Sequence, residues 1–134
     1  MTKNRTAVLS IFCAVLAFVS TGTSNAGESE WQVYSQEANG DTYFFNMSRV
    51  QSTGNSHAVW KRVRYGRSVM GASSYQSHLE IDCSEQTERV LQQTFFSDEH
   101  WERPAMSTDH TKKPKRLIAK GSASARLAEI LCGK

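Results

Sequence analysis

The chain has 134 residues, with 16 lysines and arginines against 13 aspartates and glutamates, and a formal net charge of +3. This length predicts a single domain, and beyond the N-terminus no run approaches the roughly 20 apolar residues of a membrane-spanning helix. A multispanning transporter or channel is therefore excluded, and little room is left for a cofactor-binding enzyme of the doubly wound class.

The N-terminal segment is typical of an export signal peptide. Lys3 and Arg5 precede an apolar run at residues 7–19, and the small residues that end at Ala26 fit a signal-peptidase site. We therefore expect residues 1–26 to be removed as a signal peptide. An uncleaved anchor is the alternative, although the apolar run is short for a span.

Residues 27–134 are expected to form the mature, exported domain, located in the periplasm, at the cell surface or outside the cell. Cys13 follows Phe12, which is too bulky for the residue that lipoprotein processing requires, so no lipid attachment is expected there. Without the signal peptide, 14 basic side chains face 13 acidic ones, a net charge of +1. That charge is too near neutral to indicate nucleic-acid binding.

Two cysteines remain in the mature chain, Cys83 and Cys132. In an oxidising compartment they predict a disulfide. A bridge that closes a loop of about 50 residues stabilises a small domain by roughly 4 kcal/mol in the chain-entropy model. The alternative is two free thiols in a metal site, but neither cysteine has a second ligand at close spacing.

Alternating hydrophobicity predicts strands rather than helices over most of the domain. Leu79 and Ile81 alternate with polar residues, and Val59 and Val63 share one face that Lys61 interrupts. Tight turns at Asn-Gly 39–40 and at residues 84–86 favour antiparallel neighbours, and a further loop is expected at residues 66–68. The predicted strands are residues 31–35, 42–46, 56–65, 75–83 and 87–96.

The last part of the chain changes character. Residues 97–115 contain both prolines and are predicted to form a surface loop. Ser122 is a plausible N-cap of a short amphipathic helix that ends near Cys132, with its apolar stripe on the sheet. The fold class is therefore α+β: an antiparallel meander of about five or six strands packed against a C-terminal helix. The apolar stripe comprises Ala123, Leu127, Ile130 and Leu131.

No catalytic motif stands out. Residues 54–58 only approach the G-x-S-x-G pattern, and the four histidines lack the H-E-x-x-H spacing. Asp98, Glu99 and His100 with Asp109 and His110 could gather a cation, but a solvated loop is the better interpretation. We therefore expect no enzymatic activity and no cofactor, with a small hydrolase or metal-binding protein as the alternative.

The order of short motifs resembles the surface-adhesin protein E family of Gram-negative bacteria over nearly all of the mature chain. The resemblance implies an exported antiparallel sheet backed by a C-terminal helix and stapled by a disulfide. The motifs, in chain order, are TYFFN at residues 42–46, VW at 59–60, Tyr75 leading to IDC at 81–83, SDEHW at 97–101 and ILC at 130–132.

The resemblance further implies a protein or glycan partner, in the adhesins host matrix and serum proteins such as vitronectin, laminin and plasminogen. Family adhesins are lipid-anchored, whereas this chain shows no usable lipidation signal. The alternative is therefore a soluble periplasmic module, an envelope-stress factor or an inhibitor of an envelope-attacking enzyme.

The candidate partner-binding residues are Trp60, Arg62, Arg64 and Arg67, because tryptophan and arginine dominate interface energetics. In the resembling adhesins a basic stretch before the strand of Tyr75 contributes to binding, and Arg67 is its nearest counterpart. A plain solvated strand face is the alternative. A second basic cluster, expected to attract acidic partners or sulfated glycans, comprises Lys112, Lys113, Lys115 and Arg116.

Overall fold

The computed structural model describes residues 30–133. The predicted signal peptide, the predicted start of the mature domain and Cys13 lie outside the described residues. Within residues 30–133, the single α-helix is too short and too polar to cross a bilayer.

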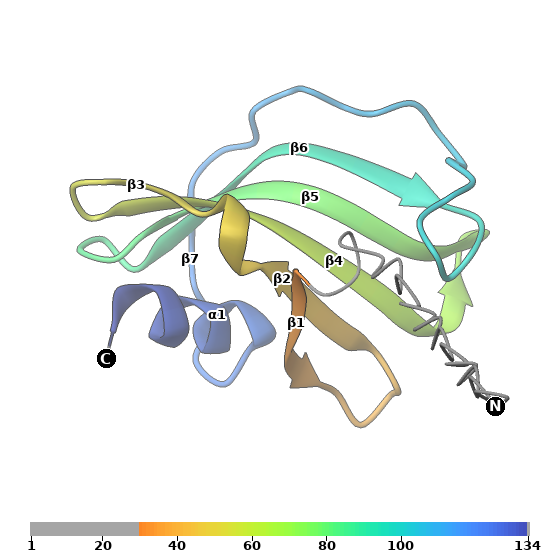
Figure 1. Cartoon of the computed structure of the whole chain (residues 1–134), viewed down its shortest axis with the longest axis horizontal. Coiled ribbons are helices and arrows are strands. Elements are labelled where there is room, and N and C mark those ends of the chain that lie inside the picture. The colour runs from red at the N-terminus through yellow and green to blue at the C-terminus, as the bar shows by residue number, and fades with distance from the viewer. Residues whose placement is uncertain (1–29, 134) are drawn as a thin grey trace, which may run out of the picture.

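The predicted α+β architecture is confirmed. One antiparallel sheet contains all the strands of the described residues. Six of them follow the order β1-β2-β4-β5-β6-β7, and β3 pairs with the first residues of β4 (Figure 1). A 3-10 turn, η1 (Met47–Arg49), joins β2 to β3. The strands are β1 (Trp31–Gln36), β2 (Thr42–Asn46), β3 (Gln51–Thr53), β4 (Ser56–Val69), β5 (Ala72–Asp82), β6 (Thr87–Phe96) and β7 (Arg116–Leu117), and the helix is α1 (Ala123–Cys132).

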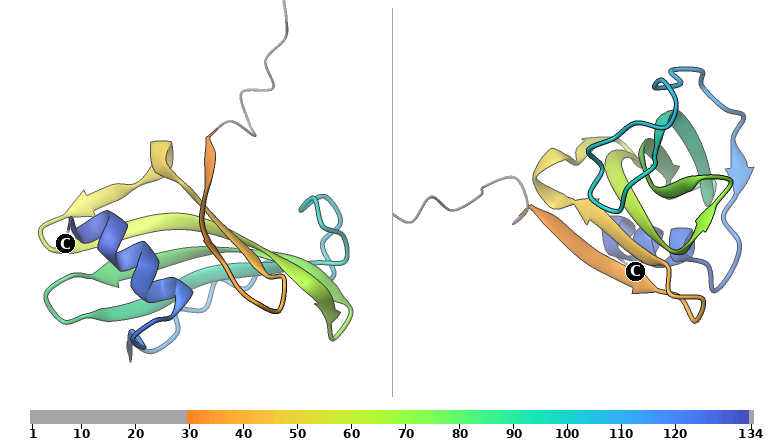
Figure 2. Two further views of the ribbon diagram at one scale, coloured as in Figure 1. Left: turned by 90° about the horizontal axis from the view of Figure 1, so that it is seen from below. Right: turned by 90° about the vertical axis from the view of Figure 1, so that its right-hand side faces the viewer.

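The sheet is curved, and α1 lies on its concave side (Figure 2). We call this side the inner face and the opposite side the outer face. The strand residues that alternate inward at the helix end are fully buried, as Val59, Leu79 and Ile81 show. The period-two pattern therefore predicted correctly which side chains face the core.

Helix α1 supplies the other half of the core. Leu127 is fully buried and Ala128 nearly so, while Ala123 and Leu131 pack at the margin of the same cluster. Ser122 caps the helix as predicted, since its Oγ accepts the Ala125 N–H at 3.1 Å.

Ile130 is a correction to the predicted apolar stripe. Its side chain is 40% exposed, whereas Ala128 is buried against the sheet. The sequence places both positions near the edges of one helical stripe, and only the docking angle of α1 decides which edge is covered.

The hairpin between β4 and β5 is longer than predicted. Residues 66–68 continue β4 instead of forming a loop, and the chain turns at Met70 and Gly71, which have φ of 51° and 84°. Two consecutive positive φ values are those of a tight hairpin turn, but methionine is not a usual first residue of such a turn, so Gly71 alone did not predict it.

Gly66 serves close packing and not a turn. A Cβ at this position would lie 2.3 Å from the carbonyl oxygen of Asn39 in the turn between β1 and β2. The Gly66 N–H also donates to Asp41 Oδ1 at 2.9 Å. The bare backbone thus lets the β1–β2 turn rest directly on β4.

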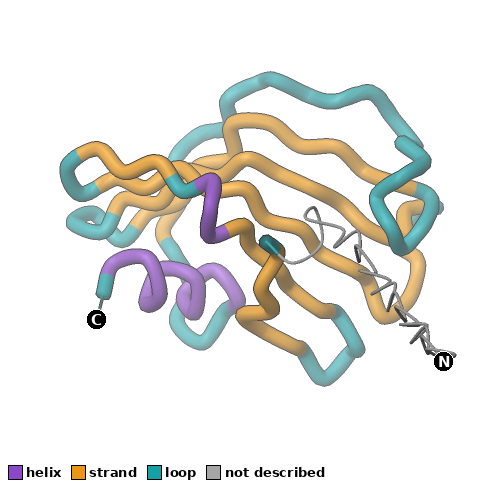
Figure 3. Tube along the Cα trace, viewed as in Figure 1, coloured by secondary structure: helices purple, strands orange, loops and turns teal. Residues whose placement is uncertain are grey.

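Residues 97–115 form the predicted surface loop, which returns along the free edge of β6 (Figures 1 and 3). Gln93 and Asp109 exchange two backbone hydrogen bonds of 2.9 Å, and the Lys113 N–H donates to the Val90 carbonyl at 2.9 Å. The loop therefore occupies backbone groups of β6 that would otherwise form an open sheet edge. Arg116 is not in this loop but begins β7.

Candidate functional site

The outer face of β4 carries a series of large cationic and aromatic side chains. Trp60, Arg62 and Arg64 alternate with the buried Val59 and Val63, so they point away from α1. Three of the four predicted partner-binding residues therefore lie on one side of one strand.

Arg62 lies between two indole rings. Its guanidinium carbon is 4.2 Å from the ring centre of Trp31 on β1 and 4.8 Å from that of Trp101 in the loop after β6. Its Nε donates to Gln76 Oε1 on β5 at 2.8 Å. Stacking of this kind fixes the plane of the guanidinium group and leaves it charged.

Arg64 continues the arrangement one step along β4. Its guanidinium carbon is 5.4 Å from the ring centres of both Trp101 and Phe44. The rings of Phe44 and Trp101 meet edge to face, with centres 5.6 Å apart. The Nε of Arg64 also donates to the Glu99 carbonyl at 3.4 Å. Trp101 is thus shared between the two arginines.

Trp60 stands at the other end of the row. Its ring stacks on that of His78 across the strand pair, with centres 4.7 Å apart and planes within 8°, and the Arg49 guanidinium carbon is 5.2 Å from its centre. Partial burial, and then the charge of Arg49, lower the pKa of His78 and so favour its neutral imidazole.

These contacts gather all three tryptophans of the chain on one surface. Each of them is half-buried and keeps part of its ring in contact with solvent. We call this surface the tryptophan–arginine face, formed by Trp31, Trp60, Trp101, Arg62 and Arg64.

Sequence reasoning missed two members of this face. Trp31 was assigned only to a strand, and Trp101 only to the loop and to the family resemblance. No periodicity in the sequence links either residue to β4, because both reach Arg62 through the curvature of the sheet and the return of a loop.

A buried aspartate holds Trp101 in place. The Asp98 carboxylate accepts the backbone N–H groups of His100, Glu102 and Arg103 at 2.8–3.3 Å and closes the loop on itself. Removal from water opposes ionisation of Asp98, but these donors together outweigh it and hold the pKa of the carboxyl below its usual value. Trp101, at φ 59°, then donates its Nε1–H to the Tyr75 carbonyl at 3.1 Å.

Loop contacts account for the two aspartates that the sequence offered for an alternative cation site. Asp98 accepts backbone donors, as described above. Asp109 accepts the Lys113 ammonium at 2.8 Å and the Thr111 N–H at 2.8 Å. The carboxylates of both aspartates are therefore engaged by groups of the loop of residues 97–115.

Arg67 lies apart from the other candidates. It is on β4, but beyond the register shift between Arg64 and Val69, and it is exposed. In the described part of the chain it makes none of the ring contacts that organise Arg62 and Arg64. The structure thus brings together Trp60, Arg62 and Arg64 and does not bring Arg67 to them.

The second basic cluster is largely neutralised. Lys113 pairs with Asp109 at 2.8 Å, Lys115 with Glu85 at 2.7 Å, and Arg116 with Glu88 at 2.6 Å. These pairs tie residues 113–116 to their neighbours and offset the positive charge that the sequence suggested.

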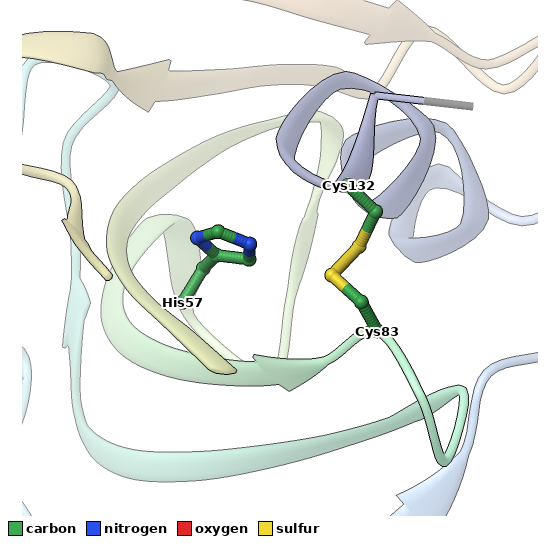
Figure 4. Close-up of side chains that lie close together, drawn as sticks. All are labelled: His57, Cys83 and Cys132. Carbon is green, nitrogen blue, oxygen red and sulfur yellow. A yellow bond between two sulfur atoms is a disulfide. The ribbon is translucent and has the colours of Figure 1, made fainter. Parts of the chain in front are cut away.

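The predicted disulfide between Cys83 and Cys132 is confirmed, with Cα atoms 5.8 Å apart, and it ties the end of α1 to the chain just after β5. His57 points toward the bridge (Figure 4), and its ring nitrogen and the two sulfurs lie within 4.8 Å of one another. A zinc ion binds thiolates, and the sulfurs of a disulfide are not thiolates. Instead, His57 Nδ1 shares a hydrogen bond of 2.7 Å with the Ser52 hydroxyl.

The fold has clear structural counterparts. A crystal form of Haemophilus influenzae protein E superimposes with a TM-score of 0.62 at 11% sequence identity, covering 78% of this chain and 88% of that chain. A selenomethionine form of the same protein gives a TM-score of 0.60 at 12% identity, covering 78% and 87%. At this identity the similarity defines the class of fold, a curved antiparallel sheet with a C-terminal helix.

The sequence itself defines the family. The model of the surface-adhesin protein E family matches residues 31–133, and the chain therefore belongs to that family. No curated protein matches the chain. The resemblance carried by the short motifs is confirmed, and the protein is an adhesin-like module.

Proposed function

We propose that the protein is an exported, non-enzymatic binding module whose tryptophan–arginine face holds a protein or glycan partner. The observation that carries this proposal is the stack of Trp31, Arg62, Trp101 and Arg64, in which each arginine is held against aromatic rings. Tryptophan and arginine are the residue types most often found at the energetic centre of an interface. Membership of an adhesin family supports the same kind of activity.

The chemistry of this face favours an acidic partner. A guanidinium group held in one plane loses little rotamer freedom on binding, and it matches the two oxygens of a carboxylate or sulfate. The indole rings beside it offer apolar area for a side chain or a sugar ring. Host matrix and serum proteins, with vitronectin, laminin and plasminogen as first candidates, and sulfated glycans present such groups.

A binding assay with matched variants tests the proposal. The protein is passed over immobilised vitronectin, laminin, plasminogen and heparin, and saturable capture of at least one is expected. A double variant, Trp60→Ala with Arg64→Ala, should weaken that capture at least about tenfold, because a hot-spot truncation costs 2 kcal/mol or more.

Arg126→Ala is the matched control, since Arg126 lies on α1 and pairs with Glu129 at 3.5 Å. Its affinity should stay within about twofold of the parent. Arg67→Ala tests whether the exposed arginine outside the tryptophan–arginine face contributes to binding. The affinity of this variant should change less than that of Arg64→Ala. Unchanged affinity in a folded double variant would remove the tryptophan–arginine face as the binding site.

We further propose that the protein is exported and acts either at the cell surface or in the periplasm. Fractionation into periplasm, outer membrane and medium distinguishes these locations. Surface or medium localisation together with capture of a host protein supports the adhesin role. A purely periplasmic protein whose deletion alters envelope sensitivity but not host-cell attachment would indicate the alternative periplasmic module instead.

A further inference from the structure

The inner face of the sheet contains a lysine that has no acidic partner. Lys61 lies on β4 between the fully buried Val59 and Val63 and is itself only 6% exposed. Among residues 30–133 its side chain forms no ion pair and no hydrogen bond, and its ammonium is 5.6 Å from the ring centre of Tyr75. A buried ammonium without a counterion is costly, so proteins rarely retain one without a use.

The nearby acid is already engaged. Glu88 on β6, 4% exposed, accepts the Arg116 Nε at 2.7 Å and Nη2 at 2.6 Å through its Oε1. Burial lowers the pKa of Lys61; the charge of Glu88 only partly opposes this, and the charge of Arg116 adds to it.

Two further polar atoms near Lys61 are buried without a partner. Ser77 is 1% exposed, and its Oγ has no hydrogen-bond partner in the described part of the chain; the same holds for Oε2 of Glu88, whose charge acts on Lys61. Buried polar atoms in native proteins nearly always have a partner, so a group of such atoms at one place indicates that a ligand or water completes it.

The strand register aligns these groups in one row. Lys61 on β4 is directly opposite Ser77 on β5, and Ser77 is directly opposite Gln93 on β6. Directly opposed residues point to the same side of a sheet, so the ammonium, the hydroxyl and the amide converge on the inner face.

A cavity of about 340 Å³ opens over this row. Its apolar wall comes from Tyr75, Val90 and Phe95, and Lys113 and Arg116 close it from the returning loop and β7. Burial raises the pKa of Tyr75 to about 12, so its hydroxyl stays protonated and able to donate. Cavities of roughly 300–1,000 Å³ with apolar walls and a few convergent polar groups are typical of small-molecule sites.

The charges around the cavity select one kind of ligand. Lys113 and Arg116 are balanced by Asp109 and Glu88, which leaves one uncompensated positive charge, that of Lys61. A single negative charge neutralises it, whereas a dianion would bring an excess charge into a partly apolar site. The apolar wall requires an apolar body beside that charge.

We propose that this cavity binds a small organic monocarboxylate, whose carboxylate accepts hydrogen bonds from Lys61 Nζ and Ser77 Oγ while its apolar body packs against Tyr75, Val90 and Phe95. The site is on the opposite face of the sheet from the tryptophan–arginine face and does not depend on the function proposed for that face.

Titration calorimetry of the disulfide-bonded protein with benzoate, phenylacetate and hexanoate tests the proposal. At least one acid should bind saturably with one-to-one stoichiometry. Its neutral amide (benzamide, phenylacetamide or hexanamide) should bind at least about tenfold more weakly, because it leaves the ammonium unpaired. Inorganic phosphate, which lacks the apolar body, should also bind more weakly.

Two variants locate the site. Lys61→Met keeps an unbranched side chain only one atom shorter and removes the charge, and it should weaken binding of the acid at least about tenfold but leave binding of the amide unchanged. Ser77→Ala should weaken acid binding several-fold. Thermal melting checks that each variant is folded, and Lys120→Met, at an exposed position, should bind like the parent.

The proposal is overturned if none of the three acids binds saturably up to roughly 10 mM, a concentration at which even weak ligands register. It is also overturned if acid and amide bind equally, or if folded Lys61→Met and Ser77→Ala variants both bind the acid as the parent does.

Discussion

The two faces of the sheet place their charged residues in different surroundings. On the outer face, Arg62 and Arg64 stay half-buried and stack on rings, with their charge still in contact with solvent. On the inner face, Lys61 is enclosed and lacks an acid partner. The same strand, β4, carries both sets at alternating positions, so one element contributes to the surface proposed for a large partner and to the cavity proposed for a small ligand.

The inner face is itself divided. Toward α1, Val59, Leu79 and Ile81 pack against Leu127, and toward the returning loop Lys61 and Ser77 line a cavity. The helix-covered half stabilises the fold, whereas the open half contains buried polar atoms that lower stability unless they are paired. Substitutions in the two halves should therefore change the free energy of unfolding in different directions as well as by different amounts.

The largest effect is expected for Leu127→Ala, because Leu127 is fully buried where α1 meets the sheet. The free energy of unfolding in urea should fall by about 2–5 kcal/mol, since the substitution leaves a cavity in the core. Ile130→Ala on the same helix, at a 40% exposed position, should cost less than about 1 kcal/mol. Equal losses would mean that α1 docks by a different edge.

Removal of the disulfide is expected to have the next largest effect. Replacing Cys83 and Cys132 together by serine opens a loop with a sequence separation of 49 residues and should lower the free energy of unfolding by roughly 2–4 kcal/mol. The near-ultraviolet circular dichroism of the tryptophans should persist while the variant is folded, because their face does not contact the bridge. Loss of that signal before unfolding would show that the two regions are coupled.

Trp101→Ala should lower the free energy of unfolding by about 2 kcal/mol, through the loss of two cation–π contacts and one hydrogen bond. Trp101→Phe keeps an aromatic ring between the arginines but cannot donate to the Tyr75 carbonyl, so it should fall between the parent and the alanine variant. Thermal melting measures both. A Trp101→Ala protein as stable as the parent would show that the stack contributes only to binding.

Lys61→Met, unlike the substitutions above, should not lower the stability of the protein. Removing a buried charge without an acid partner is expected to leave the melting temperature unchanged or to raise it, by an amount equivalent to about 1 kcal/mol. Lys113→Met, which breaks an ion pair with Asp109, is the contrasting control and should not stabilise the protein. A clear loss of stability in Lys61→Met would show that Lys61 has a structural partner.

The smallest expected effect is the loss, at acid pH, of the stabilisation that ionised Asp98 gives to its loop. Because the folded pKa of Asp98 lies below the unfolded value of about 3.9, ionised Asp98 stabilises its loop above that pH, and the stabilisation is lost as pH falls through the folded pKa. Tryptophan fluorescence should therefore change at a lower pH than an ordinary aspartate titrates. Asp98→Asn should remove this transition, whereas Asp109→Asn, at a carboxylate that pairs with Lys113, should not.

Much of this fold could be predicted from local pattern. The strands at residues 42–46 and 87–96 were predicted with the bounds that the structure shows, and Ser122 and Cys132 marked the helix. The hairpin turn at Met70 and Gly71 was not predicted because methionine is not a usual turn residue, and β3 and β7 were not predicted because strands of two or three residues have no periodicity.

The candidate site was predictable only in part. Trp60, Arg62 and Arg64 share a strand, so alternation alone placed them on one face. Trp31 and Trp101 join them from 31 and 39 positions away in the chain from Arg62, through sheet curvature and a loop closed by Asp98. Lys61 appeared in the sequence as an interruption of an apolar face, and nothing there indicated a cavity.

The sequence by itself determined the class of fold, the disulfide pair and the side of each strand that faces the core, because hydrophobic periodicity and cysteine number are local properties of the chain. Only the tertiary structure decided which aromatic rings meet the arginines and which buried polar groups remain without partners. Those outcomes depend on how far the sheet bends, where α1 ends its coverage and where the loop of residues 97–115 returns, and each of these is set by contacts between residues distant in the chain.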